Sequence, residues 1–324
     1  MPSGEASMSR FVGSRSLTVR DPVNDLSFPV LVMYPTHVPA EVVSMGPYSL
    51  EVARNAPVHG GPFPFVLISH GGGGTPLAYR TLASHLAQSG YVVAMPEHPG
   101  DNRNDRSLTE AIENLERRPR HARLAVDAVC SDAELGPRLL GDDIAVIGHS
   151  MGGYTALALA GGQPWTGPGQ RVAVTKDPRV KALVLMAPAA CWFVPNDALK
   201  DVDAPILLLV AEHDRIAPRW QGQLVLDLVP DPARVTFKVV ENANHHSFLS
   251  PFPPQMRRPD FLPAIDRAGF DREAFHRRLE RDVREFLDAA LRRSPSSPPR
   301  RQPVPEEAGG APAAVEPPHP GSSR

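Results

Sequence analysis

The stretch of this sequence best suited to chemistry is Gly148-His149-Ser150-Met151-Gly152, a Gly-x-Ser-x-Gly motif. It follows the apolar run 143–148 and precedes the Ala-rich run 151–161, a pattern that predicts a strand, a sharp turn and a helix. Small neighbours let a strand and a helix approach closely at such a turn. The motif therefore predicts that Ser150 is a nucleophile above a helix start, whose dipole favours developing negative charge. The plain alternative is an ordinary strand-to-helix turn.

A serine hydroxyl becomes a good nucleophile only when a neighbouring base removes its proton. After such a turn, the acid and then the histidine are expected further along the chain. Asp214 follows the apolar run 205–210 and precedes a helix expected to open around Pro218. We therefore predict that Asp214 orients the histidine. Glu212 is the competing carboxylate, but it lies closer to the strand. For Asp214, the plain alternative is that its side chain only caps the turn.

Two adjacent histidines, His245 and His246, follow the predicted strand 236–240. From position alone either one is a candidate base, and the other would then lie in the wall of the site. Adjacent side chains point in different directions, and no carboxylate-rich motif accompanies this pair. We therefore do not expect the two histidines to bind a metal.

An anionic intermediate at the serine requires two backbone N–H donors. One is expected from Met151, directly after the nucleophile. The other is expected from Ser69-His70-Gly71-Gly72-Gly73-Gly74, the loop after the apolar run 64–69, with Gly72 as the first choice and Gly73 as the second. No Gly-Lys-Ser/Thr follows, so the glycines do not form a phosphate loop. His70 is expected to make structural hydrogen bonds under the loop.

Further side chains follow strands at the same predicted edge of the sheet. The stretch 97–102 comes after the strand 91–95 and either lines a pocket or forms a well-bonded loop. Trp192 and Phe193 follow the strand 180–186 and either form an apolar wall or fill the core. The candidate substrate contacts are Gly73, Glu97, His98, His149, Trp192 and His246.

The elements around these residues alternate between continuous apolar runs and helical patterns. Such alternation predicts an α/β fold with a mostly parallel sheet covered by helices on both faces. Only a short stretch separates the strand 180–186 from Pro205, so we expect little or no cap domain and an open site. The predicted strands are 16–20, 29–34, 64–69, 91–95, 143–148, 180–186, 205–210 and 234–240. The predicted helices are 77–89, 107–134, 151–161, a segment around 224–228, and 270–291.

The composition fits one globular domain. The chain has 324 residues, of which 42% are hydrophobic, and its formal net charge is −2. A net charge so close to zero argues against a nucleic-acid-binding protein. The Arg pairs 117–118 and 277–278 are expected on solvated helix faces. Two cysteines, Cys130 and Cys191, are too few for a disulfide framework. They are expected to be two small buried or semi-buried thiols, with one disulfide as the alternative.

The ends of the chain differ from its middle. Residues 1–10 and 294–324 hold few large apolar side chains, and the second segment is rich in Pro, Ala and Ser. We predict that both are disordered and that 11–293 is the folded domain. The polar start has no signal-peptide pattern, and no apolar run is long enough to span a membrane. We therefore expect a cytoplasmic protein, with a mature secreted form as the alternative.

Taken together, the motifs resemble the predicted dienelactone hydrolase family of the α/β-hydrolase superfamily. They are also similar to platelet-activating-factor acetylhydrolases and to bacterial polyester hydrolases. The resemblance covers roughly residues 29–252. It rests on S-H-G-G-G-G, H-L-A-Q-S-G-Y-V-V-A-M-P-E-H-P-G-D-N, G-H-S-M-G-G, the Asp214 turn and N-H-H-S-F.

The resemblance implies roles for particular residues. The family's histidine stands in an H-x-x-F setting, which implies that His245 is the base, and Gly72 occupies the position of the family's oxyanion donor. True dienelactone hydrolases use a cysteine where this chain has Ser150, so lactone chemistry by that route is not expected. The implied activity is hydrolysis of a small carboxylic ester through an acyl-enzyme, without a metal or organic cofactor. Amide hydrolysis, acyl transfer and a non-catalytic ligand-binding protein are the alternatives.

Overall fold

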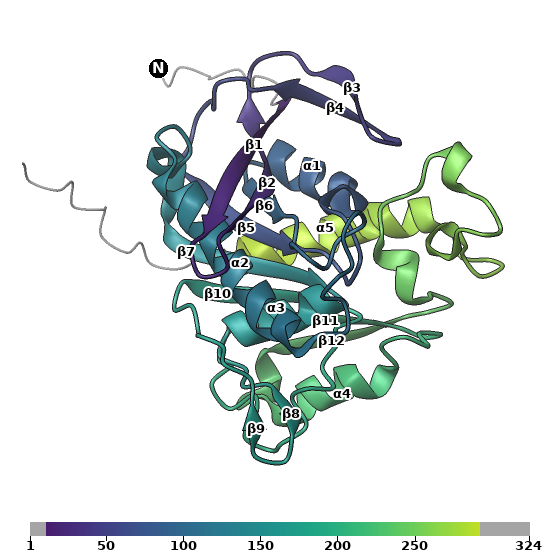
Figure 1. Ribbon diagram of the computed structural model, residues 1–324. Coiled ribbons are helices and arrows are strands. Elements are labelled where there is room, and N and C mark those ends of the chain that lie inside the picture. Colours follow the sequence, from purple (N-terminus) through teal and green to yellow (C-terminus); the bar gives the residue numbers. More distant parts are fainter. Residues whose placement is uncertain (1–10, 292–324) are drawn as a thin grey trace, which may run out of the picture. The chain divides into compact units, whose positions relative to one another are not determined.

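A ten-stranded sheet forms the centre of the structure, a computed structural model that describes residues 11–291 (Figure 1). The strands lie in the order β12-β11-β10-β7-β5-β6-β2-β1-β4-β3. They are β1 (Phe11–Asp21), β2 (Leu26–Thr36), β3 (Glu41–Met45), β4 (Tyr48–Arg54), β5 (Phe63–Ser69), β6 (Val92–Pro96), β7 (Leu139–His149), β10 (Val180–Met186), β11 (Ile206–Ala211) and β12 (Val235–Val240). A separate small hairpin consists of β8 (Trp165–Gly167) and β9 (Gln170–Arg171).

The six neighbouring strands from β12 to β6 run parallel. Strands β5, β6 and β11 are buried along their whole length, as their continuous apolar runs predicted. In register, Ser69 at the end of β5 pairs with Gly148 of β7, and Met186 at the end of β10 pairs with His149. The loops that follow these three strands therefore leave the sheet side by side, at its carboxyl edge.

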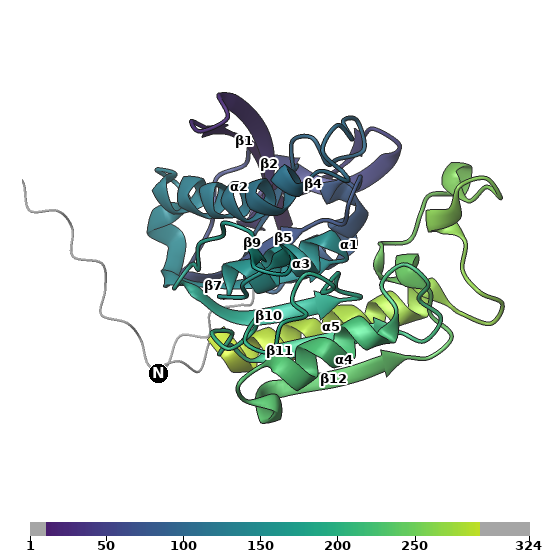
Figure 2. The same cartoon turned by 60° about the horizontal axis from the view of Figure 1, so that its bottom comes forward.

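Helices cover both faces of the sheet, and the side chains of each strand alternate between the two (Figure 2). In β7, Ile144 and Val146 pack with α2, α3 and α4, whereas Ala145 and Ile147 pack with α1 and α5. The helices are α1 (Arg80–Gln88), α2 (Ile112–Ser131), α3 (Met151–Leu159), α4 (Arg219–Leu228) and α5 (Arg272–Leu291). This layering confirms the predicted fold class.

The N-terminal part of the sheet is larger than predicted. Strands β1 and β2 contain the predicted segments 16–20 and 29–34 but are longer, and they pair antiparallel. The hairpin of β3 and β4 was not predicted. Its side chains alternate, with Glu51 and Arg54 exposed, so its apolar residues never form a continuous run. The helix predicted over 107–134 is also shorter, because residues 107–110 form turns before α2 begins.

The connection between β10 and β11 contains no helix, in keeping with the expected lack of a cap there. A longer excursion follows the 3₁₀ turn η4 (His245–Phe248) instead. Residues 249–271 return to α5 through two further 3₁₀ turns and project from the sheet layers (Figures 1 and 2). This excursion supplies much of the wall near the sheet's carboxyl edge. Its lack of periodicity explains why the sequence did not reveal it.

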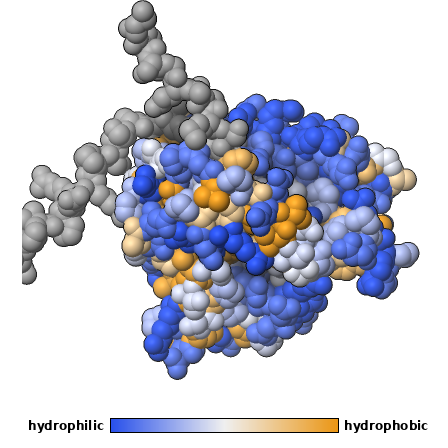
Figure 3. Space-filling model, turned by 90° about the horizontal axis from the view of Figure 1, so that it is seen from above, coloured by the Kyte–Doolittle hydropathy of each residue, from blue (hydrophilic) through white to orange (hydrophobic). Residues whose placement is uncertain are grey.

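The predicted disorder at 1–10 and 294–324 falls outside the described residues and stays a prediction, as does the cytoplasmic location. No helix in the range 11–291 is long and apolar enough to cross a membrane. On the face shown in Figure 3, hydrophilic residues predominate and hydrophobic ones form small separate patches. Cys130 is buried, as expected. The expectation was wrong for Cys191, which is exposed in the turn after β10, and neither cysteine forms a disulfide.

The packing of α5 on the sheet yields a stability prediction. Leu287 is fully buried in the cluster beneath this helix. Leu287→Ala should lower the free energy of unfolding by about 2–5 kcal/mol, since it removes buried contacts and leaves a cavity. Urea denaturation measures the effect. Leu262→Ala is the matched control, because Leu262 is 69% exposed, and equal losses in the two variants would contradict this packing.

Candidate active site

Ser150 lies on a strained turn between β7 and α3. Its backbone has φ 55° and ψ −120°, and the positive φ lies in a region that residues other than glycine seldom occupy. The turn is held from both sides. The Ser150 amide donates to the carbonyl of Met186 at 3.1 Å, and its carbonyl accepts from the amides of Gly153 at 2.8 Å and Ala189 at 2.9 Å. A strained serine at a strand-to-helix elbow presents its hydroxyl above the sheet edge.

The glycines around Ser150 are required by close contacts. A Cβ on Gly148 would lie 2.1 Å from the carbonyl oxygen of Gly152. A Cβ on Gly152 would lie 1.9 Å from the carbonyl oxygen of Ser69, at the end of β5. A Cβ on Gly153 would lie 2.6 Å from the Cβ of Pro188. The three glycines thus allow α3 to start directly against two neighbouring segments, and this contact fixes the serine.

His245 and Asp214 form a buried pair. Nδ1 of His245 lies 2.7 Å from Oδ2 of Asp214, and both side chains are almost fully buried. The other carboxylate oxygen accepts the amides of Ile216 and Ala217, each at 2.8 Å. A carboxylate can only accept, so Nδ1 carries the proton and Nε2 of a neutral His245 is left as the basic atom. Glu212, the competing carboxylate, is exposed and accepts the amide of Asn242.

Ser150 and His245 line the same cavity, of about 290 Å³. The glycine loop after β5 forms one side, and the excursion 249–271 forms another. His246 also lines this cavity, and burial lowers its pKa to about 4. The remaining described residues of the lining are Tyr48, Thr75, Ala78, Tyr79, Arg103, Arg106, His149, Leu249, Phe252, Phe261 and Pro263.

His149 connects the glycine loop to His245 through hydrogen bonds. Its Nε2 lies 2.9 Å from the carbonyl oxygen of His245, which can only accept, so Nε2 is the donor. Its Nδ1 lies 2.9 Å from the hydroxyl of Tyr79, which also accepts the amide of Gly71 at 3.2 Å. Burial lowers the pKa of His149 well below its usual value, so the ring is neutral and Nδ1 accepts from Tyr79.

Two backbone amides remain available beside Ser150. Among the described residues, no protein acceptor receives the amides of Gly72 or Met151. The first amide of a helix has no acceptor within that helix, which accounts for Met151. By contrast, the Gly73 amide donates to Oδ1 of Asp101 at 2.7 Å. The geometry therefore leaves the amides of Gly72 and Met151 without a protein acceptor beside Ser150, whereas the Gly73 amide is engaged by Asp101.

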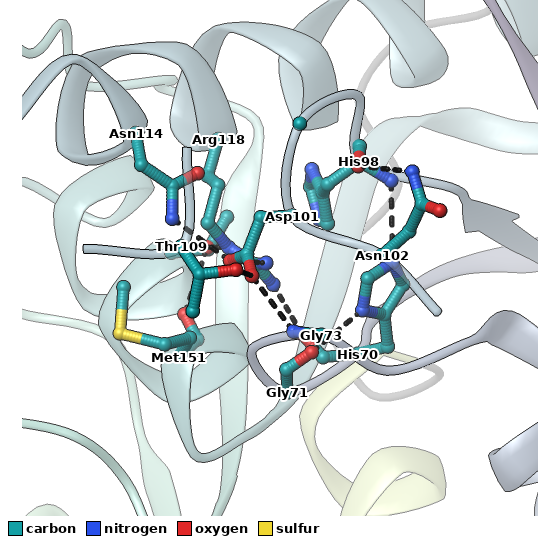
Figure 4. A network of polar contacts seen from close by, with 12 residues as sticks. His70, Gly71, Gly73, His98, Asp101, Asn102, Thr109, Asn114, Arg118 and Met151 are labelled. Carbon is teal, nitrogen blue, oxygen red and sulfur yellow. Dashed lines mark hydrogen bonds and ion pairs between the residues drawn. The ribbon is translucent and has the colours of Figure 1, made fainter. Parts of the chain in front are cut away.

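A buried ion pair holds this glycine loop in place (Figure 4). Asp101 and Arg118 are both fully buried, and Nη1 of Arg118 donates to Oδ2 of Asp101 at 2.7 Å. The same guanidinium donates to the carbonyl oxygen of His70 and to Oγ1 of Thr155 in α3. Asp101 also accepts from Gly73, as described above. The pair thus joins α2, α3 and the glycine loop.

The placement of Arg118 corrects a sequence expectation. The pair 117–118 was expected on a solvated helix face, but Arg118 points into the molecule toward Asp101. A partner 17 residues away gives no local pattern, so the sequence offered no sign of this ion pair. The stretch 97–102 was expected either to line a pocket or to form a well-bonded loop. None of its residues lines the cavity of Ser150, and Asp101 and Asn102 are hydrogen-bonded within the protein.

Some predicted contacts lie away from the cavity. His98 is fully buried and bonds with Ser69 Oγ, and its amide donates to Nε2 of His70. His70 serves the structural role expected of it, and burial lowers its pKa to about 3. Glu97 does not line the cavity. Trp192 packs edge-on against the buried Tyr154 and borders a different hollow.

Comparison with known proteins supports the same fold. The model of the alpha/beta hydrolase fold family matches residues 64–204. A solved structure, the ferulic acid esterase from Streptomyces cinnamoneus, superposes with a TM-score of 0.67 at 18% identity. The superposition covers 94% of this chain and 96% of that one. The chain has the α/β-hydrolase fold.

Two cutinases of Thermobifida alba, est1 and est2, are also similar to this chain. Each is 25% identical over 183 residues, which cover 56% of this chain and 52% of the cutinase. The chain thus spans about half the length of the curated relatives it matches. The resemblance to α/β-hydrolases drawn from the sequence motifs is confirmed, whereas the closer likeness to dienelactone hydrolases stays a prediction. Within residues 11–291, no group of His, Cys, Asp and Glu is arranged to hold a metal.

The tight elbow yields a second prediction. Gly152→Ala should destabilise the protein by at least about 2 kcal/mol, because the new methyl group would overlap the carbonyl oxygen of Ser69. Thermal unfolding followed by circular dichroism measures this. Gly167→Ala is the control, since its Cβ would meet only the end of the Gln170 side chain at 3.2 Å. A Gly152→Ala protein as stable as the control would show that the elbow tolerates a side chain.

The buried pair yields a third prediction. Asp101→Asn keeps the shape of the side chain but leaves the Arg118 charge buried without its carboxylate, which should cost about 3 kcal/mol of folding free energy. Urea unfolding measures the loss. Asp25→Asn is the matched control, because Asp25 pairs with Arg20 on the surface, and its midpoint should equal that of the parent. Equal midpoints for both variants would refute the supporting role of Asp101.

Proposed function

We propose that this protein is a serine hydrolase that cleaves small carboxylic esters through an acyl-enzyme. The observation that carries the proposal is that Ser150 and the imidazole paired with Asp214 line one cavity. The relatives support the ester class, since they are cutinases and a ferulic acid esterase. The cavity of about 290 Å³ fits a small acyl or alcohol group.

In the proposed first half-reaction, Nε2 of His245 takes the proton of the Ser150 hydroxyl as its Oγ attacks the ester carbonyl carbon. The carbonyl π electrons move to oxygen, and the amides of Gly72 and Met151 stabilise the resulting oxyanion. The carbonyl re-forms and the bond to the alcohol oxygen breaks. His245 returns its proton to that oxygen, and the alcohol leaves.

The second half-reaction repeats these steps with water. His245 removes a proton from a water molecule as the water oxygen attacks the acyl carbon. The amides of Gly72 and Met151 stabilise the second oxyanion. The bond to Ser150 Oγ then breaks, His245 reprotonates the serine, and the carboxylic acid leaves. Asp214 fixes the tautomer and orientation of His245 throughout and stabilises its protonated form.

The test of this proposal is the loss of activity on removing the nucleophile. Ser150→Ala should lower kcat/KM for para-nitrophenyl acetate by at least about ten-thousandfold. Ser131→Ala, at the exposed end of α2, is the control and should retain the parent rate. Hydrolysis by Ser150→Ala at the parent rate would refute the mechanism.

A fluorophosphonate probe tests the nucleophile independently of the substrate. Mass spectrometry should locate the adduct on Ser150 in the parent and find none in Ser150→Ala. An unlabelled Ser150 in the native protein would favour a non-catalytic, ligand-binding protein instead. Faster cleavage of para-nitroanilides than of matched esters would identify an amide hydrolase, because the same triad supports both reactions.

A further inference from the structure

Two guanidinium groups lie in the wall of the cavity that contains Ser150. Arg103 and Arg106 come from the loop between β6 and α2, and the proposed mechanism uses neither. The Arg106 guanidinium lies against Gly73, the neighbour of the proposed oxyanion donor Gly72. A Cβ on Gly73 would lie only 2.8 Å from Nε of Arg106, so the absence of a side chain at position 73 makes room for this group.

Neither arginine has an acidic partner. Within the described part of the chain, neither Arg103 nor Arg106 forms an ion pair, and no Asp or Glu lines the cavity. The nearby carboxylates are engaged elsewhere. Asp101 is bound to Arg118, and Asp105 accepts the amides of Gly100 and Ser107. Neither guanidinium group is therefore held in an ion pair beside the reacting centre.

The other titratable groups of the lining do not offset this charge. Burial raises the pKa of the Tyr48 phenol, so it is neutral at pH 7 although Arg103 and Arg80 lie close to it. Burial also keeps His149 and His246 neutral at this pH. Around neutral pH the fixed charge of the cavity is thus set by the arginines, whose guanidinium groups stay protonated.

Another part of the wall is apolar. Leu249, Phe252 and Phe261 come from the excursion 249–271, and Phe252 and Phe261 pack edge-on with ring centres 5.3 Å apart. The cavity therefore presents an aromatic side and a cationic side to the same bound molecule. Planar guanidinium groups recognise carboxylates through paired hydrogen bonds.

We propose that the preferred substrates are esters that carry a carboxylate, held by Arg103 and Arg106 while the uncharged part of the molecule lies on the aromatic wall. This inference rests on the proposed ester hydrolysis. The carboxylate belongs either to the acyl part or to the alcohol part of the ester. Both cases share the same recognition chemistry, and the experiment below separates them.

The experiment uses two pairs of matched substrates. For the acyl side, the para-nitrophenyl monoester of adipic acid is compared with its neutral carboxamide analogue. For the alcohol side, para-acetoxybenzoate is compared with para-acetoxybenzamide. The full-length protein should hydrolyse the carboxylate member of one pair with a kcat/KM about tenfold above that of the neutral member, the size expected for exposed ion pairs. This ratio should fall toward one as NaCl rises from about 20 mM to about 500 mM, because salt screens exposed charges.

The arginine variants show where the preference originates. In Arg103→Gln/Arg106→Gln the ratio should fall to about one. It should persist in Arg278→Gln, which removes an exposed charge from α5, away from the cavity. A ratio of one in the parent would overturn the inference. So would an equal loss of kcat/KM for the carboxylate and the neutral substrate in Arg103→Gln/Arg106→Gln, because it would show that Arg106 only supports the glycine loop.

Binding measurements separate this inference from the proposed function. Isothermal titration of Ser150→Ala with the carboxylate and neutral substrates requires no turnover. Preferential binding of the carboxylate that disappears on replacing both arginines would support their carboxylate-binding role even if the parent hydrolyses no ester. Equal binding of both members would overturn it, while Ser150-dependent hydrolysis of either would leave the proposed function standing.

Discussion

The ion pair of Asp101 with Arg118 is the interaction on which the rest of the site depends. A buried charge is costly unless it is paired and hydrogen-bonded, and here each member satisfies the other. Because Arg118 belongs to α2 and also contacts α3 and the glycine loop, the pair sets their relative positions. The loop conformation that leaves the Gly72 amide free follows from this attachment, since the same carboxylate takes the neighbouring Gly73 amide.

The parallel sheet brings the remaining parts together. Three neighbouring strands end in register, so the glycine loop, the serine elbow and the chain after β10 meet at one edge. His245 comes from further along the sheet, after β12. The hydrogen bonds that run from Gly71 through Tyr79 and His149 to the His245 carbonyl connect that distant turn to the loop. The two halves of the site thus have a direct connection besides the sheet.

The sequence predicted what depends on local pattern. Continuous apolar runs revealed the parallel strands, and the Gly-x-Ser-x-Gly spacing located the elbow, because both are encoded by near neighbours. Features that depend on distant partners were not predictable. Arg118 looked like a surface residue because its partner lies on another loop. The apolar residues of the hairpin of β3 and β4 are interrupted by polar ones and form no continuous run. The wall formed by 249–271 has no periodicity at all, so only the folded chain shows that it faces Ser150.

The position of β12 has a consequence for how activity responds to mild denaturation. This strand lies at the margin of the sheet and pairs only with β11, and several of its side chains are exposed. Edge strands open locally at a lower free-energy cost than strands in the centre of a sheet. The histidine therefore rests on one of the least protected parts of the sheet, whereas the serine rests on one of the best protected. We expect warming or dilute denaturant to disconnect the two before the bulk of the helices and strands is lost.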